Sequence, residues 1–392
     1  MIRSLTFFAL CLSAACSQLP TEAPVVEVLE GDLCQTQTFR VDADFSAANM
    51  ASCKVLSETS IEVLLQPEDT PINPSPWYAV RLTPNQAGKV RLVLQYEEHP
   101  HRYKPKVSLD GEAWTVLPED RVDVKAEGFR VTLDLDLETQ PLFVSAQELY
   151  TNAAHEAWTR AQAEKPFVTM SEIGNSIEGR PISMIRTEAS FETAKTVMIT
   201  GRQHPPEIPG ALAYDRFVEE VLSDTDLANT FRSKFDLIMI PNINPDGVEH
   251  GHWRHNKGGL DLNRDWGPFT QPETQAVKAV IDGIEPPGLV LFLDFHSTSK
   301  NVYYTQPLGN DGTDYDFTES WLNGGRELLP EYKFLRQGSH NLTLPTSKTY
   351  IHETYGIPAI TYEVGDETDR TEARETARVL AQEMMRLLLE HE

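Results

Sequence analysis

The sequence predicts an all-β, sandwich-like domain followed by an α/β domain with a mixed, mostly parallel sheet flanked by helices. Two observations predict this. Residues 31–146 contain short segments of alternating polarity, such as 90–96 and 131–137, and no long helical pattern. From residue 147 onward, apolar strand-like runs alternate with segments of helical periodicity, which is typical of a largely parallel sheet covered by helices.

The chain of 392 residues is long enough for two such domains, and its formal charge is −25. Lysine and arginine are scattered along an acidic chain. This argues against nucleic-acid binding and against electrostatic binding to anionic lipid. We interpret the acidic excess as a solvated surface, not as recognition of a particular partner.

The N-terminus has the features of an export signal. Arg3 precedes an apolar run over residues 5–12, which is too short to cross a bilayer, and small residues lead up to Cys16. A cysteine directly after small residues resembles the lipobox of bacterial lipoproteins, although the usual leucine is displaced by one position. We expect residues 1–15 to be a signal peptide, Cys16 to be the lipid-carrying first mature residue and residues 16–30 to be a tether. Ordinary secretion is the alternative.

These features predict an exported protein, either periplasmic or anchored to the outer membrane of a bacterium as a lipoprotein. In that oxidising compartment Cys34 and Cys53 are an even pair that can form a disulfide, and two buried thiols are the alternative. No segment of the mature chain is long and apolar enough to cross a membrane. Contact with a membrane is therefore expected only through Cys16.

The second half of the chain begins with a last β strand over 143–146 and a helix over 148–162. Apolar runs then predict the central strands of the sheet at 196–200, 237–240, 289–295 and 359–362. Polar side chains cluster at the carboxyl ends of these runs. Open α/β sheets bind their ligands along that edge, so we expect a functional site there.

The turn after the run at 196–200 contains the first metal-binding pattern. His204 and Glu207 stand three positions apart in it, and apolar residues then recur at helical spacing from Ile208 to Leu222. A histidine and a carboxylate at this spacing can hold a divalent metal, and zinc suits them best. A polar turn without such a function is the alternative.

Two later strands end in polar residues of the same kind. His296 follows the run at 289–295, where it would complete a zinc site that keeps one coordination position open. A hydrogen-bonded core histidine is the alternative. Glu363 follows the run at 359–362, and a carboxylate at the end of a buried strand is costly unless it is paired or functional.

The loop after the run at 237–240 is rich in groups that bind carboxylates. It contains Arg254, Asn263 and Arg264. An arginine fork binds a carboxylate through two parallel hydrogen bonds. Surface salt bridges are the alternative for these arginines.

In this order the residues resemble the zinc carboxypeptidases of the carboxypeptidase A type. The family pattern is His-x-x-Glu, an arginine, Asn-Arg, a distant histidine and a final glutamate, and it falls on His204, Glu207, Arg254, Asn263, Arg264, His296 and Glu363. Residues 173–180 are similar to the family's opening segment. The short gap from Arg254 to Asn263 and the preceding β domain resemble the cytosolic carboxypeptidase branch and its bacterial relatives. The resemblance covers residues 145–365, which places a zinc carboxypeptidase domain at 147–392.

The resemblance implies an enzyme with one Zn2+ per chain. His204, Glu207 and His296 would hold the metal, and Glu363 would act as general base on a metal-activated water. Asp261 resembles the carboxylate that orients the first zinc histidine.

The same resemblance implies the contacts to substrate. Arg254 would stabilise the developing oxyanion. Asn263 and Arg264 would bind the free terminal carboxylate, which distinguishes an exopeptidase from an endopeptidase. Tyr350 is expected to cap the substrate, and Tyr355 is the other candidate.

The chain departs from the family pattern on the substrate side. Thr298 stands where relatives often have a tyrosine, so part of that wall is expected to differ. Asp265 and Asp294 are close to the site in sequence, and we expect structural roles for both.

The pocket for the terminal side chain is expected within residues 335–362. Arg336, His340 and Lys348 fall there, and a basic lining would favour an acidic terminal residue. Solvated cationic side chains are the alternative.

The leading hypothesis is a metallocarboxypeptidase that removes the C-terminal residue of peptides or proteins, with cell-wall stem peptides among the candidates. An amidohydrolase of small N-acyl amino acids, similar to aspartoacylase, is the alternative on the same fold, because its substrates also carry a carboxylate. A non-catalytic binding protein on a peptidase scaffold is a third hypothesis. The presence of all three ligands together with Glu363 argues against it.

Overall fold

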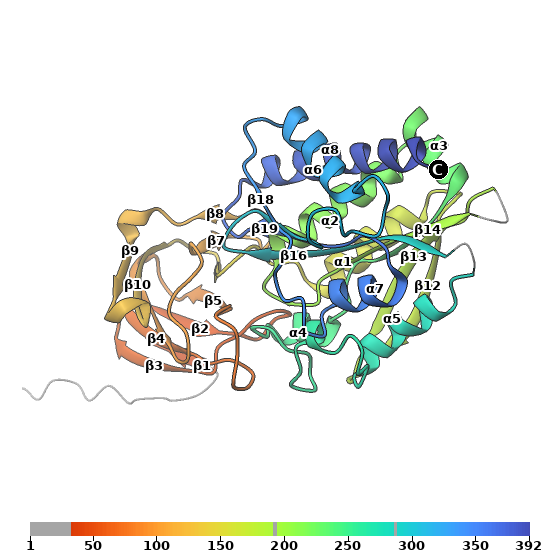
Figure 1. The fold of residues 1–392 in the computed structure, drawn as a ribbon. Coiled ribbons are helices and arrows are strands. Elements are labelled where there is room, and N and C mark those ends of the chain that lie inside the picture. The colour runs from red at the N-terminus through yellow and green to blue at the C-terminus, as the bar shows by residue number, and fades with distance from the viewer. Residues whose placement is uncertain (1–32, 191–193, 286–287) are drawn as a thin grey trace, which may run out of the picture.

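The computed structural model describes residues 33–190, 194–285 and 288–392. The chain forms two antiparallel-rich β sheets near its N-terminus and one large mixed sheet covered by helices (Figure 1). This confirms the predicted fold class. The predicted signal peptide, Cys16 and the tether lie outside the described residues.

The N-terminal region, here called the β region, contains a six-stranded and a five-stranded sheet. The first sheet has the order β1 (Leu33–Gln35), β2 (Phe39–Asp42), β5 (Ala79–Pro84), β11 (Leu142–Ser145), β7 (Lys106–Ser108) and β8 (Thr115–Val116). The second has the order β3 (Ser52–Ser57), β4 (Ser60–Leu65), β6 (Gly88–Tyr96), β10 (Arg130–Leu137) and β9 (Val122–Lys125). Two short 3-10 turns, Glu119–Arg121 and Ala126–Gly128, flank β9.

The two sheets of the β region share one hydrophobic core. Buried residues of the first sheet, such as Phe39 and Val41, belong to the same cluster as Leu92 and Leu133 of the second sheet. Side chains alternate between buried and exposed along β10, as expected for a strand with one face in the core. A disulfide joins Cys34 in β1 to Cys53 in β3 and so links the two sheets. Of the two possibilities that the sequence left open, a disulfide or two buried thiols, the structure shows the disulfide.

The mixed sheet has eight strands. Their order is β12 (Thr169–Asn175), β13 (Pro181–Thr187), β15 (Phe235–Ile240), β14 (Lys195–Gly201), β16 (Leu289–Thr298), β19 (Ala359–Gly365), β17 (Val302–Tyr304) and β18 (Leu335–Gln337). The four central strands, from β15 to β19, are mutually parallel. Their carboxyl ends therefore lie along one edge, where the sequence places the candidate site.

Helices cover both faces of the mixed sheet. One face packs against α1 (Asn152–Ala163), α2 (Ile208–Val221), α3 (Asp226–Lys234), α6 (Phe317–Leu328) and α8 (Arg370–Glu390). The other face packs against α5 (Pro272–Asp282) and α7 (Ser347–Tyr355). The short helix α4 (Pro245–His250) and the 3-10 turn η3 (Leu262–Arg264) lie in the loop that follows β15.

The first helix is shorter than predicted. It starts at Asn152 instead of residue 148, because the Thr151 side chain accepts a hydrogen bond from the Ala154 amide and so caps the helix there. The predicted central strands are all present, although β16 continues past His296 to Thr298. Within the part of the chain that is described, none of the helices is both long and apolar enough to span a membrane.

Candidate active site

The turn between β14 and α2 holds His204 and Glu207 in place through Arg202. Arg202 has a left-handed backbone, with φ 55°, which is uncommon for a residue with a side chain. Its Nε and Nη2 atoms both donate to the carbonyl of Pro205, at 3.0 and 2.8 Å, and Nη1 lies 3.0 Å from Nε2 of His155. These contacts close the turn on itself, with the two candidate ligands inside it.

Three buried side chains converge at this turn. Nδ1 of His204 lies 2.9 Å from one carboxylate oxygen of Glu207, and Nδ1 of His296 lies 2.8 Å from the other. The two imidazole Nδ1 atoms are 3.1 Å apart. Ligand atoms of all three residues fall within 4.8 Å of one another, and no other such group of His, Cys, Asp or Glu is found among the residues the structure describes.

The far nitrogen of each imidazole contacts a carboxylate. Nε2 of His204 is 2.9 Å from Asp261, and Nε2 of His296 is 2.8 Å from Asp294. An ionised carboxylate only accepts hydrogen bonds, so in the neutral histidines Nε2 carries the proton. Both Nδ1 lone pairs are then directed at the space beside Glu207. Two imidazole nitrogens, a carboxylate and an open position form the donor set of catalytic zinc sites, so these residues fit zinc.

The charges around this space also favour a cation. Burial alone would raise the pKa of Glu207, but the neighbouring His204 and His296 hold it well below its usual range. Burial alone would lower the pKa of His296, but Asp294 and Glu207 raise it well above the usual value. The carboxylates thus draw positive charge to the position that a divalent metal would occupy.

Asp294 has a role at this site that was not expected from the sequence. It is fully buried, it contacts the third candidate ligand, and it also accepts hydrogen bonds from Thr200, Gln203 and Ser347. The sequence holds a usable indication, because Asp294 stands two residues before His296 on one strand. Side chains at that spacing point to the same face of a sheet.

Replacing Asp294 by asparagine is expected to weaken zinc binding about 10- to 100-fold, because the amide no longer fixes and polarises the His296 ring. Titration with a competing zinc chelator measures this change. Asp265→Asn is the matched control, since Asp265 is equally buried but bonds to Thr270, Gln271 and Thr274 and contacts no candidate ligand. Equal zinc affinities for the two variants would contradict the role given to Asp294.

Glu363 lies beside the metal-binding residues. In the register of β16 and β19 it is paired with His296, so the two side chains leave adjacent strands at the same level. Its Oε2 atom is buried and makes no hydrogen bond within the described residues. Burial raises the pKa of Glu363 to about 8, and the neighbouring Glu207 carboxylate adds to the shift. A carboxylate without a partner, next to a metal site, has the properties of a general base.

Arg254 lines the same cleft. Its Nε atom donates to Asp261 at 2.7 Å, and its Nη1 atom is 4.0 Å from Glu207. Asp261 therefore contacts both Arg254 and His204, one with each oxygen. Burial would lower the pKa of Arg254, but Asp261 and Glu207 outweigh it, so the guanidinium stays charged.

Asn263 and Arg264 are brought to the cleft by the η3 turn. The Oδ1 atom of Asn263 accepts a hydrogen bond from the Ser347 amide at 2.9 Å, which leaves its amino group for a ligand. Arg264 donates to the Asn263 carbonyl at 2.6 Å, and 29% of its side chain remains exposed. Both residues line the same cleft as the metal-binding residues.

This cleft has a volume of about 380 Å³ and is lined mainly by polar side chains. Four cationic side chains line it: Arg102, Arg254, Arg264 and Lys348. The β region contributes to its wall through residues 73–75 and Arg102. The Arg102 guanidinium bonds to Asp366, which follows the end of β19, at 2.9 Å. The β region is therefore part of the site and not a separate appendage.

Tyr350, expected at the substrate, does not line this cleft. Its ring packs on α7 against Phe269 and Trp266, with centroid distances of 4.9 and 6.3 Å. The tyrosine that does line the cleft is Tyr304, at the end of β17, where its ring stacks on His340 at 3.9 Å. No local pattern marks Tyr304 in the sequence, because its place depends on the pairing of β17 with β19.

Two of the three residues expected in the specificity pocket line the cleft. His340 and Lys348 do so, as does Thr298. Arg336 does not, because it forms ion pairs with Glu319 and Asp316 near α6. Of the three expected residues, Arg336 is therefore not part of the lining, and burial lowers the pKa of His340.

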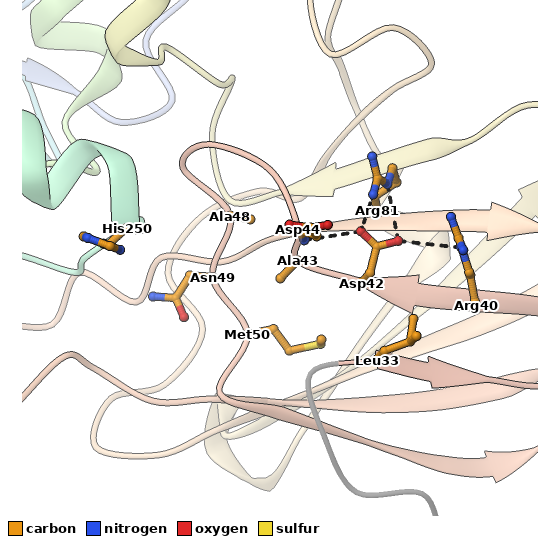
Figure 2. A pocket seen from close by; sticks show the side chains of 10 residues that line it. All are labelled: Leu33, Arg40, Asp42, Ala43, Asp44, Ala48, Asn49, Met50, Arg81 and His250. Atoms are coloured by element: carbon orange, nitrogen blue, oxygen red, sulfur yellow. Dashed lines mark hydrogen bonds and ion pairs between the residues drawn. The ribbon is translucent and has the colours of Figure 1, made fainter.

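A larger cavity lies elsewhere, between β2, β5 and α4 (Figure 2). Within it Asp42 pairs with Arg81 at 2.6 Å and lies 3.8 Å from Arg40. It contains none of the candidate site residues. The candidate site residues therefore belong to the cleft around His204 and not to this cavity.

Comparison with known proteins agrees with this geometry. The family model described as Zinc carboxypeptidase matches residues 155–383 of the chain. Cytosolic carboxypeptidase 6 of Caenorhabditis elegans is 28% identical over 163 residues, which make up 38% of this chain and 36% of that protein. The human protein of the same name is 27% identical over 161 residues, which make up 38% of this chain and 32% of that protein. The chain spans less than half the length of each of these relatives.

Solved structures share the whole fold. The metallo-carboxypeptidase of Burkholderia cenocepacia has a TM-score of 0.75 at 22% identity, over 90% of this chain and 98% of that one. The metallo-carboxypeptidase of Pseudomonas aeruginosa has a TM-score of 0.74 at 21% identity, over 90% of this chain and all 100% of that one. At this coverage the shared fold includes the β region as well as the mixed sheet.

Proposed function

Because the chain belongs to the zinc carboxypeptidase family, we propose that it removes the C-terminal residue of peptides or proteins in the cleft beside His204, Glu207 and His296. The observation that carries the proposal is the set of groups that meet in this one cleft. Next to the metal-binding residues lie the Glu363 carboxylate, whose Oε2 atom makes no hydrogen bond within the described residues, and the guanidinium groups of Arg254 and Arg264. Zinc bound there would polarise the scissile carbonyl and lower the pKa of a water molecule toward about 7.

Residues of the chain carry out proton transfer, stabilisation of the developing charge and binding of the terminal carboxylate. Glu363 takes the proton of the attacking water and passes it to the leaving amine. Arg254, held by Asp261, is aimed at the negative charge that develops on the carbonyl oxygen. The Asn263 amino group and Arg264 bind the free carboxylate and so place the terminal bond beside Glu363.

Peptides with free and with amidated C-termini test the proposal. The free peptides are expected to lose one residue at a time. The amidated peptides are expected to react at least about 100-fold more slowly, because Arg264 and Asn263 are then left without a carboxylate to bind. Equal cleavage of both forms would contradict the role of Arg264. Arg264→Met should reduce the discrimination, whereas Arg326→Met, on α6 outside the cleft, should leave it unchanged.

Two further kinds of substrate, tested beside these peptides, distinguish a cell-wall peptidase and an amidohydrolase from a general carboxypeptidase. Peptides that end in D-amino acids represent cell-wall stem peptides, and N-acetyl amino acids represent the substrates of an amidohydrolase. Faster release from N-acetyl amino acids than from any peptide would favour the aspartoacylase-like alternative. The match to the zinc carboxypeptidase family supports the peptidase.

Lys348 supports a preference for acidic terminal residues. It is 2% exposed, and its ammonium has no hydrogen bond or ion pair within the described part of the chain, although it lines the cleft. A buried charge without a partner is costly unless a ligand supplies the opposite charge. We therefore propose that the side-chain carboxylate of a terminal glutamate or aspartate pairs with Lys348.

This preference should depend on pH. Burial lowers the pKa of Lys348 to about 8, partly opposed by Glu353, so the side chain is charged below that pH and neutral above it. The ratio of kcat/KM for peptides ending in glutamate and in glutamine is expected to fall as the pH rises from about 7 to about 9. Lys348→Met should give a low ratio at every pH. Lys348→Arg should keep a high ratio throughout, since arginine remains charged. A constant ratio in the wild-type chain would exclude Lys348 as the acid-binding group.

We also propose that the chain is exported and anchored by lipid at Cys16. The N-terminal sequence pattern supports this, and so does the Cys34–Cys53 disulfide, since such bonds are typical of oxidising compartments. In a bacterial host, Cys16→Ser is expected to abolish incorporation of labelled fatty acid and to move the protein from the membrane to the soluble fraction. Unchanged membrane association would contradict the anchor.

A further inference from the structure

The segment that carries Arg254 is docked on the β region. The carbonyl of Glu249 accepts a hydrogen bond from the Ala47 amide at 2.8 Å, and the Asn49 side chain donates to the Gly251 carbonyl at 2.6 Å. Figure 2 shows Asn49 in the loop of the β region and His250 of α4 facing each other across the cavity. The approach is close enough that a Cβ on Gly251 would lie 2.7 Å from the Ala47 carbonyl oxygen.

One carboxylate of the β region holds the backbone at Arg254 itself. Glu68, three residues after β4, accepts hydrogen bonds from three consecutive amides of this segment. Its Oε2 atom is 2.7 Å from the Trp253 nitrogen, and its Oε1 atom is 2.9 Å from the Arg254 nitrogen and 2.6 Å from the His255 nitrogen. Hydrogen bonds to an ionised acceptor are about twice as strong as those between neutral groups. The Glu68 carboxylate therefore holds the backbone of residues 253–255 in one position.

The residues on either side of Arg254 are also anchored to the β region. Trp253 is fully buried in the hydrophobic cluster of the β region. Asp69, next to Glu68, lies 2.5 Å from Nδ1 of His255. The backbone at Arg254 therefore has little freedom to shift or turn away from the cleft.

The side chain of Arg254 continues this arrangement into the site. Its Nε atom bonds to Asp261, and its Nη1 atom lies 4.0 Å from Glu207. Asp261 fixes the guanidinium at its far end, and Glu68 fixes the main chain at its near end. A group that stabilises a transition state must be held at both ends, because a displacement of about 1 Å can cost about 100-fold in rate.

We propose that Glu68 is a positioning residue for Arg254, through which the β region sets the rate of the reaction in the cleft. The inference rests on the proposed carboxypeptidase function and goes beyond it, because it gives the β region a task in catalysis. Glu68 itself does not line the cleft, so it acts only through the segment it holds.

A double-mutant cycle tests this inference. Glu68→Ala is expected to lower kcat about tenfold, with little change in KM or in zinc content, because Arg254 acts in the transition state. In an Arg254→Ala background the same change should cost less than about twofold, since the group that Glu68 positions is gone. Glu68→Gln keeps the shape and one acceptor oxygen, and it should lie between wild type and alanine.

Ser46→Ala is the matched control. Ser46 also joins the β region to this segment, by a 2.9 Å hydrogen bond to the Glu249 side chain, but it does not touch the amides at 253–255. It should leave kcat and KM unchanged. Hydrogen exchange gives a second readout that needs no substrate: the amides of 253–255 should exchange faster in Glu68→Ala and at the wild-type rate in Ser46→Ala.

The outcomes separate the inference from the proposed function. Equal losses of kcat from Glu68→Ala in both backgrounds would overturn the inference, because Glu68 would then act by another route. Unchanged exchange of the 253–255 amides would also overturn it. If the wild-type chain released no residue from any peptide, the proposed function would fail, whereas the exchange rates would still show whether Glu68 holds the segment.

Discussion

Replacing Glu363 by glutamine is expected to reduce kcat for peptide hydrolysis about 1,000-fold while the protein keeps its zinc. Glutamine has nearly the same shape but cannot accept the proton of the attacking water. The unbonded Oε2 atom means that no hydrogen bond of the fold is lost by the change. Removing a carboxylate close to Glu207 also relieves a repulsion, since each carboxylate opposes ionisation of the other. The variant should therefore be folded, metal-loaded and nearly inactive.

Steady-state kinetics with a free-acid peptide, together with zinc analysis of the same sample, measure both parts of this result. Glu367→Gln is the matched control. Glu367 lies four residues further on, accepts a hydrogen bond from the Lys104 amide and lies 3.8 Å from the buried Lys106 ammonium, so its replacement should keep full activity. Undiminished kcat in Glu363→Gln would remove Glu363 as the base. Loss of zinc would show instead that Glu363 contributes to metal binding.

The part of the site that was predictable from sequence consists of residues at strand ends. The four apolar runs mark central parallel strands, and parallel strands bring their carboxyl ends to one edge. His204, His296 and Glu363 each follow or end one of those runs, so a local pattern together with the strand order places them together. The family resemblance supplied their roles, and the register of β16 and β19 accounts for the closeness of His296 and Glu363.

The tyrosine that lines the cleft was not predictable in this way. Tyr350 and Tyr304 stand in segments whose place depends on how α7 packs and how the edge strand β17 pairs with β19. Neither relation leaves a periodic pattern in the sequence. The two tyrosines therefore differ in position in a way that the sequence does not show: Tyr350 packs against Phe269, and Tyr304 lines the cleft.

The contacts of the β region with the site were equally unpredictable from the sequence. Glu68 is separated by 186 residues from Arg254, whose amide it binds, and Arg102 by 264 residues from Asp366. Contacts between distant segments arise from packing of the two regions against each other, which propensity and periodicity do not encode. In the sequence Glu68 and Arg102 look like ordinary charged residues beside strands, and only their partners reveal what they do.

Replacing His296 by alanine is expected to have the most complete effect. Zinc content should fall from about one per chain to nearly none, and hydrolysis should stop, because two ligands hold zinc far more weakly than three. The change also leaves the Glu207 and Asp294 carboxylates without the imidazole that lies between them, so the metal-free site gains repulsion. His340→Ala is the control, since His340 lines the same cleft but stacks on Tyr304 and belongs to no ligand set. It should retain its zinc.

The two variants separate metal binding from proton transfer at adjacent positions. His296 and Glu363 are paired in register on neighbouring strands, so a general disturbance of this edge of the sheet would affect both variants alike. If the site instead consists of zinc ligands and a separate base, the two variants should differ. Glu363→Gln should keep the metal and lose turnover, whereas His296→Ala should lose both. Circular dichroism of each variant shows whether the fold persists. If both variants lost zinc equally, Glu363 would be a fourth ligand, and the proton would have to move through another group of the cleft.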